Sequence, residues 1–442
     1  MLEIFTPGII ALWLNLVAGS PAITDRDIAT LWDLPTQVLS GQAEPDVQRL
    51  VQQYLNNLAR KGPKPTVQGI WIQTGQSLLA DHQGTVPLSA ASLTKVATSL
   101  VALDTWGLEH RFETLVSATG PIEKGILKGS LIVQGSGDPL FVWEEAIALG
   151  NALNKLGIRQ VQGNLLITGP FYMNYEMDLG KSGMLLKQAL DSRSWYGEIE
   201  YQHQLMPSGT PRPEVSITGK VFVSKTPIPK SILLIRHQSL PLFQLIKLMN
   251  VYSNNAMAEI LAESVGGAQQ VAAKAAAAAA VPPNEIQLIN GSGLGEANRI
   301  SPRAVCALFV AIQQRLHTPL PLAKRFSYTI ADLFPVAGRD DGTVLGRRMP
   351  LHASVKTGTL DEVSALAGVF PTRDRGLVWF AILNSGGGDW DDFRARQDQL
   401  LQQIQASLGR PVELSPAITP QIATNDPLLQ LGASLRNQMV GQ

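Results

Sequence analysis

The sequence lacks several features that would place a protein in a class. It holds one cysteine, Cys306, in 442 residues, so no internal disulfide can form. Charged residues make up only 16% of the chain, and 36 Lys and Arg balance 36 Asp and Glu, so no net charge draws it to nucleic acid or anionic membranes. Hydrophobic residues make up 45%, which excludes a disordered chain and suffices for a large core.

Long apolar runs and metal-ligand patterns are also absent. The run Ile9 to Val17 is short of the roughly 20 residues that a transmembrane helix needs. The small residues at 18–22 resemble the end of a secretory signal, but no Lys or Arg precedes the run. A signal or anchor and an apolar segment packed on the protein therefore both stay open for residues 1–43. The six histidines show no metal-ligand spacing, so we expect no metal and no cofactor.

Apolar periodicity predicts a helix-covered sheet built from both ends of the chain. Two strands precede a helix that begins near Ser92, and three strands precede a long amphipathic helix near the C-terminus. These elements predict an α+β fold with an antiparallel sheet of about five strands, and a helix at 44–60 on the same face as the C-terminal one. The expected strands are 69–74, 78–82, 353–359, 364–370 and 376–384, and the C-terminal helix is 390–408.

The middle of the chain has a different character and predicts an insertion. Short strand-like runs separated by Gly and Pro indicate a mostly-β module at 107–236, with one or two helices around 143–156. The main domain would then consist of residues 44–106 and 237–409. Residues 410–442 show no clear period and predict a loosely docked C-terminal tail.

Three short motifs carry candidate chemistry, and the first is Ser92-Leu93-Thr94-Lys95. Positions i and i+3 of a helix share a face, so the Lys95 ammonium could reach the Ser92 hydroxyl. A serine hydroxyl needs a base, and a lysine is a base only when neutral. Burial and a second positive charge both lower a lysine pKa toward that state. Taken alone, a chance Ser-x-x-Lys is the better interpretation.

The second motif is Ser253-Asn254-Asn255, between helical stretches. Ser253 could relay a proton, and the Asn255 amide can both donate to and accept from a substrate amide. Such tripeptides are more often helix caps, so this motif is also weak when it is taken alone.

The third motif is Lys356-Thr357-Gly358-Thr359, in a predicted strand. Lys356 offers positive charge, Thr357 a hydroxyl for a carboxylate, and Gly358 a close approach of a substrate backbone. The backbone N–H of Thr359 could point at a carbonyl under attack. An ordinary edge strand with a solvent-facing lysine is the alternative.

Jointly and in this order, the motifs resemble the signature of penicillin-binding proteins and class A β-lactamases. Over roughly residues 44 to 405 the chain is similar to the class C low-molecular-mass penicillin-binding proteins, the D-alanyl-D-alanine carboxypeptidase/endopeptidase family. Further segments that resemble this family are Ile126-Leu127-Lys128-Gly129-Ser130-Leu131, Gly135-Ser136-Gly137-Asp138-Pro139, Asn290-Gly291-Ser292-Gly293-Leu294, Phe334-Pro335-Val336-Ala337-Gly338 and Asp341-Gly342-Thr343. Asn290 stands where the family has Asp, and we expect a structural role there.

The resemblance implies a penicillin-binding/β-lactamase-like transpeptidase fold and acyl transfer. Ser92 would attack the carbonyl between two D-alanines, Lys95 would take its proton, and Ser253 would pass a proton to the leaving D-alanine. Lys356 would keep the site positive and, with Thr357, hold the terminal carboxylate. The backbone N–H groups of Ser92 and Thr359 would form the oxyanion hole.

The implied function is therefore a serine-type D-alanyl-D-alanine carboxypeptidase, with endopeptidase action as a second activity. Its partners would be peptidoglycan peptides ending in D-Ala-D-Ala, and β-lactams would bind covalently as inhibitors. Such substrates place the enzyme in the periplasm or cell envelope. The resemblance gives neither an oligomeric state nor a nucleic-acid partner.

Two alternatives stay open. A class A β-lactamase would need a second carboxylate base, and no convincing Glu-x-x-Leu-Asn segment is present. A non-catalytic penicillin or cell-wall binding module would be expected to lose a reactive group, and all are present. Ser92 and Ser253 are 161 positions apart, a shorter gap than the family's, and residues 170–205 match none of its patterns. Gly180-Lys181-Ser182 mimics the end of a phosphate-binding loop and is interpreted as a surface turn.

Overall fold

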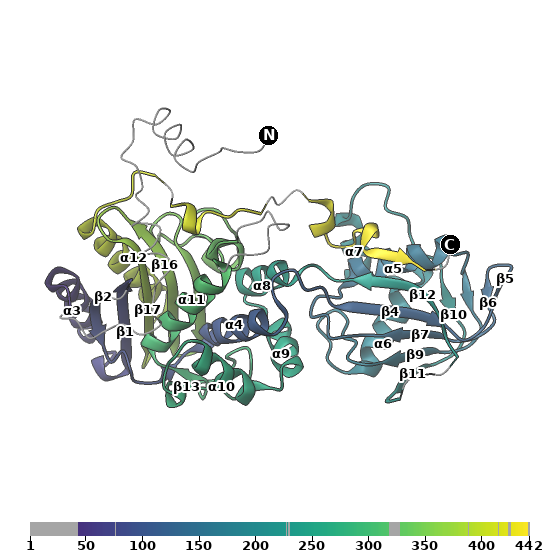
Figure 1. Cartoon of the computed structure of the whole chain (residues 1–442), viewed down its shortest axis with the longest axis horizontal. Helices are drawn as coiled ribbons and strands as arrows, with labels where there is room; N and C mark the ends of the chain where they lie inside the picture. Colours follow the sequence, from purple (N-terminus) through teal and green to yellow (C-terminus); the bar gives the residue numbers. More distant parts are fainter. Residues whose placement is uncertain are drawn as a thin grey trace, which may run out of the picture.

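The computed structural model describes residues 43–75, 77–226, 228, 230–317, 328–387, 389–413, 415–422 and 426–440. The expected N-terminal segment lies outside these residues, except for Ala43. Figure 1 shows a larger and a smaller body side by side, with the C-terminal segment crossing from the first to the second. None of the helices within the described part of the chain is long and apolar enough to cross a membrane.

The larger body is built on the five-stranded antiparallel sheet that the sequence predicted, in the order β15-β16-β17-β1-β2. Strands from both ends of the chain meet where β1 pairs with β17. Because side chains alternate between the faces and helices cover both faces, β16 is buried along its whole length. The strands are β1 (Gln68–Thr74), β2 (Ser77–His82), β15 (Ser354–Leu360), β16 (Val363–Thr372) and β17 (Gly376–Ser385).

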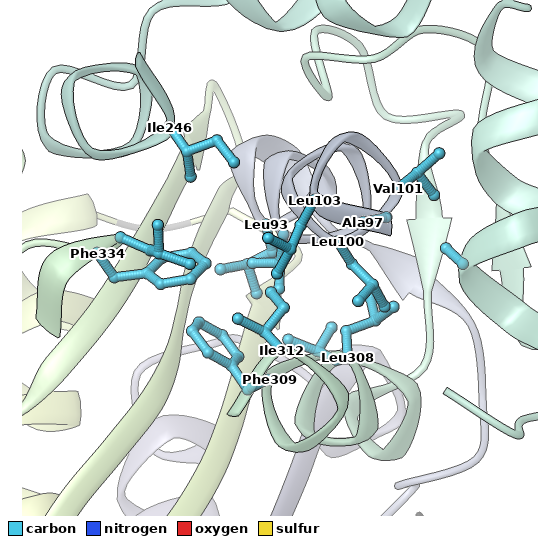
Figure 2. Close-up of a cluster of buried hydrophobic side chains, with 14 of the residues drawn as sticks. Leu93, Ala97, Leu100, Val101, Leu103, Ile246, Leu308, Phe309, Ile312 and Phe334 are labelled. Carbon is cyan, nitrogen blue, oxygen red and sulfur yellow. The ribbon is translucent and has the colours of Figure 1, made fainter. Parts of the chain in front are cut away.

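Helices form a layer on each face of this sheet. As expected, α3 and α12 pack together on one face, over strand residues such as Ile70 and Phe380. On the other face, α4 packs against α11, with Leu100 near Leu308, while Phe309 lies against Phe334 (Figure 2). The helices of this body are α3 (Pro45–Ala59), α4 (Thr94–Trp106), α8 (Leu242–Val251), α9 (Asn255–Ser264), α10 (Ala268–Ala278), α11 (Pro302–Leu316) and α12 (Trp390–Ser407). A small antiparallel sheet joins β3 (Leu88–Ser89), β14 (Arg299–Ile300) and β13 (Ile286–Gln287).

The smaller body is formed by the inserted segment together with the end of the chain. A six-stranded sheet in the order β11-β9-β7-β4-β12-β18 stands beside a four-stranded one in the order β10-β8-β6-β5. The strands are β4 (Glu113–Ala118), β5 (Ile122–Glu123), β6 (Ile126–Leu127), β7 (Leu131–Gln134), β8 (Gln160–Val161), β9 (Leu165–Thr168), β10 (Ser216–Ile217), β11 (Val221–Ser224), β12 (Ile232–Gln238) and β18 (Asn437–Met439).

The insertion carries more helix than the sequence indicated. Its helices are α5 (Trp143–Lys155), α6 (Leu179–Ala189) and α7 (Glu198–Leu205). Gly180 and Gly183 lower the helix propensity of α6, so the sequence pattern did not predict this helix. The surface turn expected at Gly180-Lys181-Ser182 is wrong, because these residues lie in α6, with Asp178 as its N-cap. Ser182 is buried there and donates to the backbone oxygen of Glu176.

Three glycines stack where the two sheets of the smaller body meet. Gly129, Gly163 and Gly219 lie between β6 and β7, β8 and β9, and β10 and β11, respectively. The N–H of Gly163 donates to Gly129 O at 2.9 Å, and the N–H of Gly219 to Gly163 O at 3.1 Å. A Cβ on Gly163 would lie 2.7 Å from Gly129 O. Only glycine therefore allows the three connections between the two sheets to pack this closely.

We expect Gly163→Ala to lower the free energy of unfolding by about 2 kcal/mol, because its methyl group would overlap backbone atoms that the sheets hold in place. The midpoint of urea denaturation measures this. Gly180→Ala in the same body is the control. The atom nearest to its new methyl would be the Asp178 side-chain oxygen at 3.2 Å, and alanine favours the helix, so its midpoint should not fall. Equal midpoints for both variants would contradict the packing argument.

The end of the chain is more firmly placed than the loosely docked tail that the sequence predicted. Strand β18 adds to the edge of the six-stranded sheet by antiparallel pairing with β12. Beside it, the Arg436 guanidinium forms an ion pair with Glu145 of α5, and both side chains are buried. The tail prediction was wrong here because β18 is three residues long and pairs with a strand some 200 positions away. A local apolar period cannot reveal such pairing.

Candidate active site

Ser92 lies in a tight turn at the start of α4. Residues Ala91–Leu93 form a 3₁₀ turn, and α4 follows from Thr94. Ala91 has a φ of 45°, a left-handed conformation that costs a non-glycine residue energy. Gly293 packs so closely beneath that a Cβ there would overlap Ala91 O. This strained turn leaves Ser92 partly exposed, while Leu93, Thr94 and Lys95 are buried.

Lys95 is a buried lysine aimed at Ser92. Its Nζ donates to Ser92 Oγ at 3.0 Å, to Asn255 Oδ1 at 2.7 Å and to the backbone oxygen of Ser292 at 2.7 Å. These acceptors come from three separate segments, so the ammonium has a defined position. Burial lowers the pKa of Lys95 to about 7, against the opposing effect of the Glu259 carboxylate. Lys95 is therefore neutral in a large fraction of molecules near neutral pH and can act as a base.

Ser253 faces the same site from the connection between α8 and α9. It has a φ of 52°, and Asn254 then caps α9 by accepting from the Met257 N–H. Ser253 Oγ accepts from Lys356 Nζ at 3.0 Å. Asn255 begins α9 and turns its side-chain oxygen to Lys95. The helix-cap interpretation applies to Asn254, whereas Ser253 and Asn255 contact the two lysines.

Lys356 is the second buried lysine of the site. It lies in the middle of β15, and its Nζ also donates to Thr357 O at 2.7 Å. Burial first, and then the charge of Lys95, hold the pKa of Lys356 well below its usual range. Because two ammonium groups share this low-dielectric site, a bound anion would stabilise the charged form of either lysine.

The strand β15 passes close beside Ser92. A Cβ on Gly358 would lie 3.0 Å from Ala90 O and 3.1 Å from Ser92 N, which is why glycine is needed there. This brings the backbone of β15 next to the backbone N–H of Ser92. Thr357 is buried, and Thr359 Oγ accepts from Arg394 Nη2 of α12 at 3.1 Å. Hydrogen bonds thus link Lys95 with Ser92 and Asn255, and Lys356 with Ser253 and Thr357. The two remaining predicted site residues, Gly358 and Thr359, follow directly on β15.

Sequence reasoning missed three contributors to this site. The backbone oxygen of Ser292 accepts from Lys95, and the Glu259 carboxylate acts on the same lysine electrostatically. Arg394 reaches Thr359 from the far face of the sheet. The spacing of Glu259, one helical turn after Asn255, was a signal that could have been used. Asn290 has the structural role expected, because its amide donates to Leu294 O and accepts from the Gly293 N–H.

No group of three or more His, Cys, Asp or Glu side chains in the described ranges is placed to hold a metal ion. Cys306 is fully buried in α11, as a packing cysteine would be, and burial raises the pKa of its thiol well above the usual range.

Known proteins with similar sequences are D-alanyl-D-alanine carboxypeptidases. DacB of Haemophilus influenzae is 24% identical over 401 residues, which cover 68% of this chain and 80% of DacB. The carboxypeptidase of Actinomadura sp. strain R39 is 23% identical over 484 residues, which cover 84% of this chain and 85% of the relative.

Solved structures share the fold. A predatory peptidoglycan endopeptidase of Bdellovibrio bacteriovorus superimposes with a TM-score of 0.65 at 21% identity, covering 80% of this chain and 96% of its own. Its penicillin G acylated form gives 0.61. Penicillin-binding protein 4 of H. influenzae gives 0.59 at 20% identity and covers 82% and 99%. Residues 51–180 and 200–407 match the D-Ala-D-Ala carboxypeptidase 3 (S13) family, and the chain belongs to that family.

Proposed function

We propose that this family member is a serine-type D-alanyl-D-alanine carboxypeptidase whose nucleophile is Ser92 and whose base is Lys95. The observation that carries this proposal is the 3.0 Å hydrogen bond between Ser92 Oγ and a buried lysine with a pKa of about 7. An ordinary lysine, with a pKa above 10, would stay protonated and could not accept the serine proton at neutral pH.

The reaction proceeds by acylation and hydrolysis. Ser92 Oγ attacks the carbonyl carbon of the penultimate D-alanine while its proton passes to Lys95 Nζ. Collapse of the tetrahedral intermediate breaks the C–N bond, and the leaving amine takes a proton from Ser253. Ser253 regains a proton from the Lys356 ammonium that is hydrogen-bonded to its hydroxyl, so the positive charge lost by Lys356 matches the one gained by Lys95. Water then cleaves the Ser92 ester and releases the shortened peptide. The side-chain oxygen of Asn255 is bonded to Lys95, so its NH₂ group remains available to orient the peptide substrate.

The same arrangement supports binding of the substrate carboxylate. Lys356 is placed to supply positive charge beside Ser253, and the Thr357 and Thr359 hydroxyls follow it on β15. The backbone N–H groups of Ser92 and Thr359 provide the oxyanion hole, and Gly358 lets the two segments approach. A β-lactam offers a carboxylate and a reactive amide together, so it would acylate Ser92 as a substrate does.

The substrate class also places the enzyme in the periplasm or cell envelope, because peptidoglycan peptides lie outside the cytoplasmic membrane. An endopeptidase activity would use the same residues on a D-alanyl bond within a cross-link. Cell fractionation and digestion of a purified cross-linked peptide dimer test these two points. Detection of the protein only in the cytosol would contradict the location. A peptide dimer that stays intact would contradict the endopeptidase activity.

Incubation with benzylpenicillin and with a peptide ending in D-Ala-D-Ala tests the function as a whole. We expect release of the terminal D-alanine from this peptide, no release of the terminal L-alanine from the matched peptide ending in D-Ala-L-Ala, and a lasting penicillin adduct. Intact mass and peptide mapping should place that adduct on Ser92. Rapid turnover of the drug without an adduct would identify a β-lactamase. If the folded protein neither releases D-alanine nor reacts with penicillin, a non-catalytic binding module becomes the better interpretation.

A further inference from the structure

The glutamate Glu259 has no place in the acyl transfer described above, yet it is built into the site. It lies on α9 one turn after Asn255, so both side chains lie on one face of the helix. Its two oxygens accept the backbone N–H groups of Gly291 at 2.9 Å and Ser292 at 3.0 Å. The carboxylate thereby binds two successive peptide units of the loop at 290–294.

That loop is the support on which Lys95 rests. The backbone oxygen of Ser292 accepts from Lys95 Nζ at 2.7 Å, and that of Gly291 accepts from the Thr98 hydroxyl at 2.7 Å. Gly293 then lies against Ala91, immediately before Ser92. Rotation of the peptide units held by Glu259 would therefore move the oxygen that fixes Lys95 and the turn that presents the nucleophile.

The carboxylate also sets the electrostatic surroundings of the base. The Glu259 carboxylate on α9 acts on Lys95, and the charge of Lys95 acts in turn on Lys356 of β15. Glu259 favours the protonated form of Lys95, whereas burial opposes it. Among the described residues, Glu259 is the carboxylate that acts on Lys95, so its loss would leave the charge that Lys95 gains from the serine proton without this offset.

We propose that Glu259 is the positioning residue for Lys95: it holds the 290–294 loop under the lysine and balances the positive charge that Lys95 gains during acylation. This role rests on the proposed function, because it acts only through the Ser92–Lys95 pair.

The test is the pH dependence of the acylation rate constant with benzylpenicillin in the full-length protein. In Glu259→Gln, loss of the charge lowers the pKa of Lys95, so the acidic limb of the profile should move about one pH unit lower. The plateau should fall about tenfold, because an amide cannot accept both backbone N–H groups and the loop shifts. Glu259→Asp keeps the charge, so its limb should stay in place while its plateau falls.

Glu263→Gln is the matched control, because Glu263 lies one turn further along α9 and is exposed. It should leave the limb and the plateau unchanged. If the plateau rate of Glu259→Gln falls but its acidic limb stays at the wild-type pH, the charge role is overturned and only a structural role remains. If Glu259→Gln does not fold, an unchanged plateau in Glu259→Asp would overturn the positioning role. A wild-type protein without a Ser92 adduct would instead refute the proposed function itself.

Discussion

Ser92→Ala should abolish the penicillin adduct and lower release of D-alanine by about 10⁴-fold or more. The substitution removes the hydroxyl oxygen that forms the ester in the proposed mechanism, while Lys95 keeps its hydrogen bonds to Asn255 and Ser292. The site should therefore stay assembled. Binding of the peptide should persist, because the side chains that hold the carboxylate are untouched. Intact-mass measurement after drug treatment and an assay of free D-alanine give the two readings.

Ser89→Ala is the matched control for that result. Ser89 lies three positions before Ser92 and is buried, and its Oγ has no hydrogen-bond partner among the described residues. Removing this hydroxyl should cost neither stability nor activity. An adduct that survives in Ser92→Ala would move the nucleophile to another hydroxyl of the site, with Ser253 the first to test. Loss of the adduct in Ser89→Ala would show that a substitution near the Ser92 turn can abolish acylation by disturbing the structure alone.

The parts of the fold that were predictable are those whose signal is local. The strand β16 and the helix α12 each bury a continuous or periodic set of apolar side chains, so their patterns are visible in a short window. The three motifs were informative for a similar reason, since each places reactive side chains at fixed spacing on one element. Their joint order then indicated one site, although no single motif did.

The parts that were missed depend on backbone atoms or on distant partners. The oxygen of Ser292 holds Lys95, but any residue has a backbone oxygen, so nothing in its identity indicates this role. The glycines Gly129, Gly163 and Gly219 pack against one another at unequal intervals along the chain, which conceals their equivalence. Strand β18 is mostly polar and gains its place by pairing with β12. Only the assembled structure brings these pairs together.

The tail that ends in β18 links the two bodies physically. It leaves the larger body after α12 and reaches the smaller one (Figure 1). There, Arg436 and Glu145 form a buried ion pair. Strand β12, which β18 covers, leads directly into α8 and then to Ser253. The C-terminal strand thus supports the segment that presents Ser253, even though it contributes no group to the chemistry.

The two lysines of the site divide the work between charge and proton transfer. Lys95 contacts the nucleophile, whereas Lys356 contacts Ser253 and β15. Both are buried, so one additional negative charge in the site is strongly favoured. On the proposed function, a substrate with a free terminal carboxylate supplies that charge beside Lys356, and Lys95 remains the base.

Lys95→Arg separates proton transfer from charge. The guanidinium keeps the positive charge and can donate to Asn255 and Ser292, but it stays protonated at every working pH and cannot accept the serine proton. We expect the acylation rate constant with benzylpenicillin to fall about 10³-fold, within the range for loss of a general base. The wild-type rate should rise with pH through about 7, because the neutral form of Lys95 is the active one. The acylation rate of the Lys95→Arg variant should show no such rise near pH 7.

Lys247→Arg provides the comparison, because Lys247 is another largely buried lysine whose pKa burial lowers. It pairs with Asp340 at 2.6 Å and donates to two backbone oxygens, away from Ser92. Arginine can keep the pairing with Asp340, so this variant should retain the wild-type pH limb and rate. If Lys95→Arg also kept the limb near pH 7, another group would be the base. A lowered pKa alone does not make a lysine a base, since it must also contact the nucleophile.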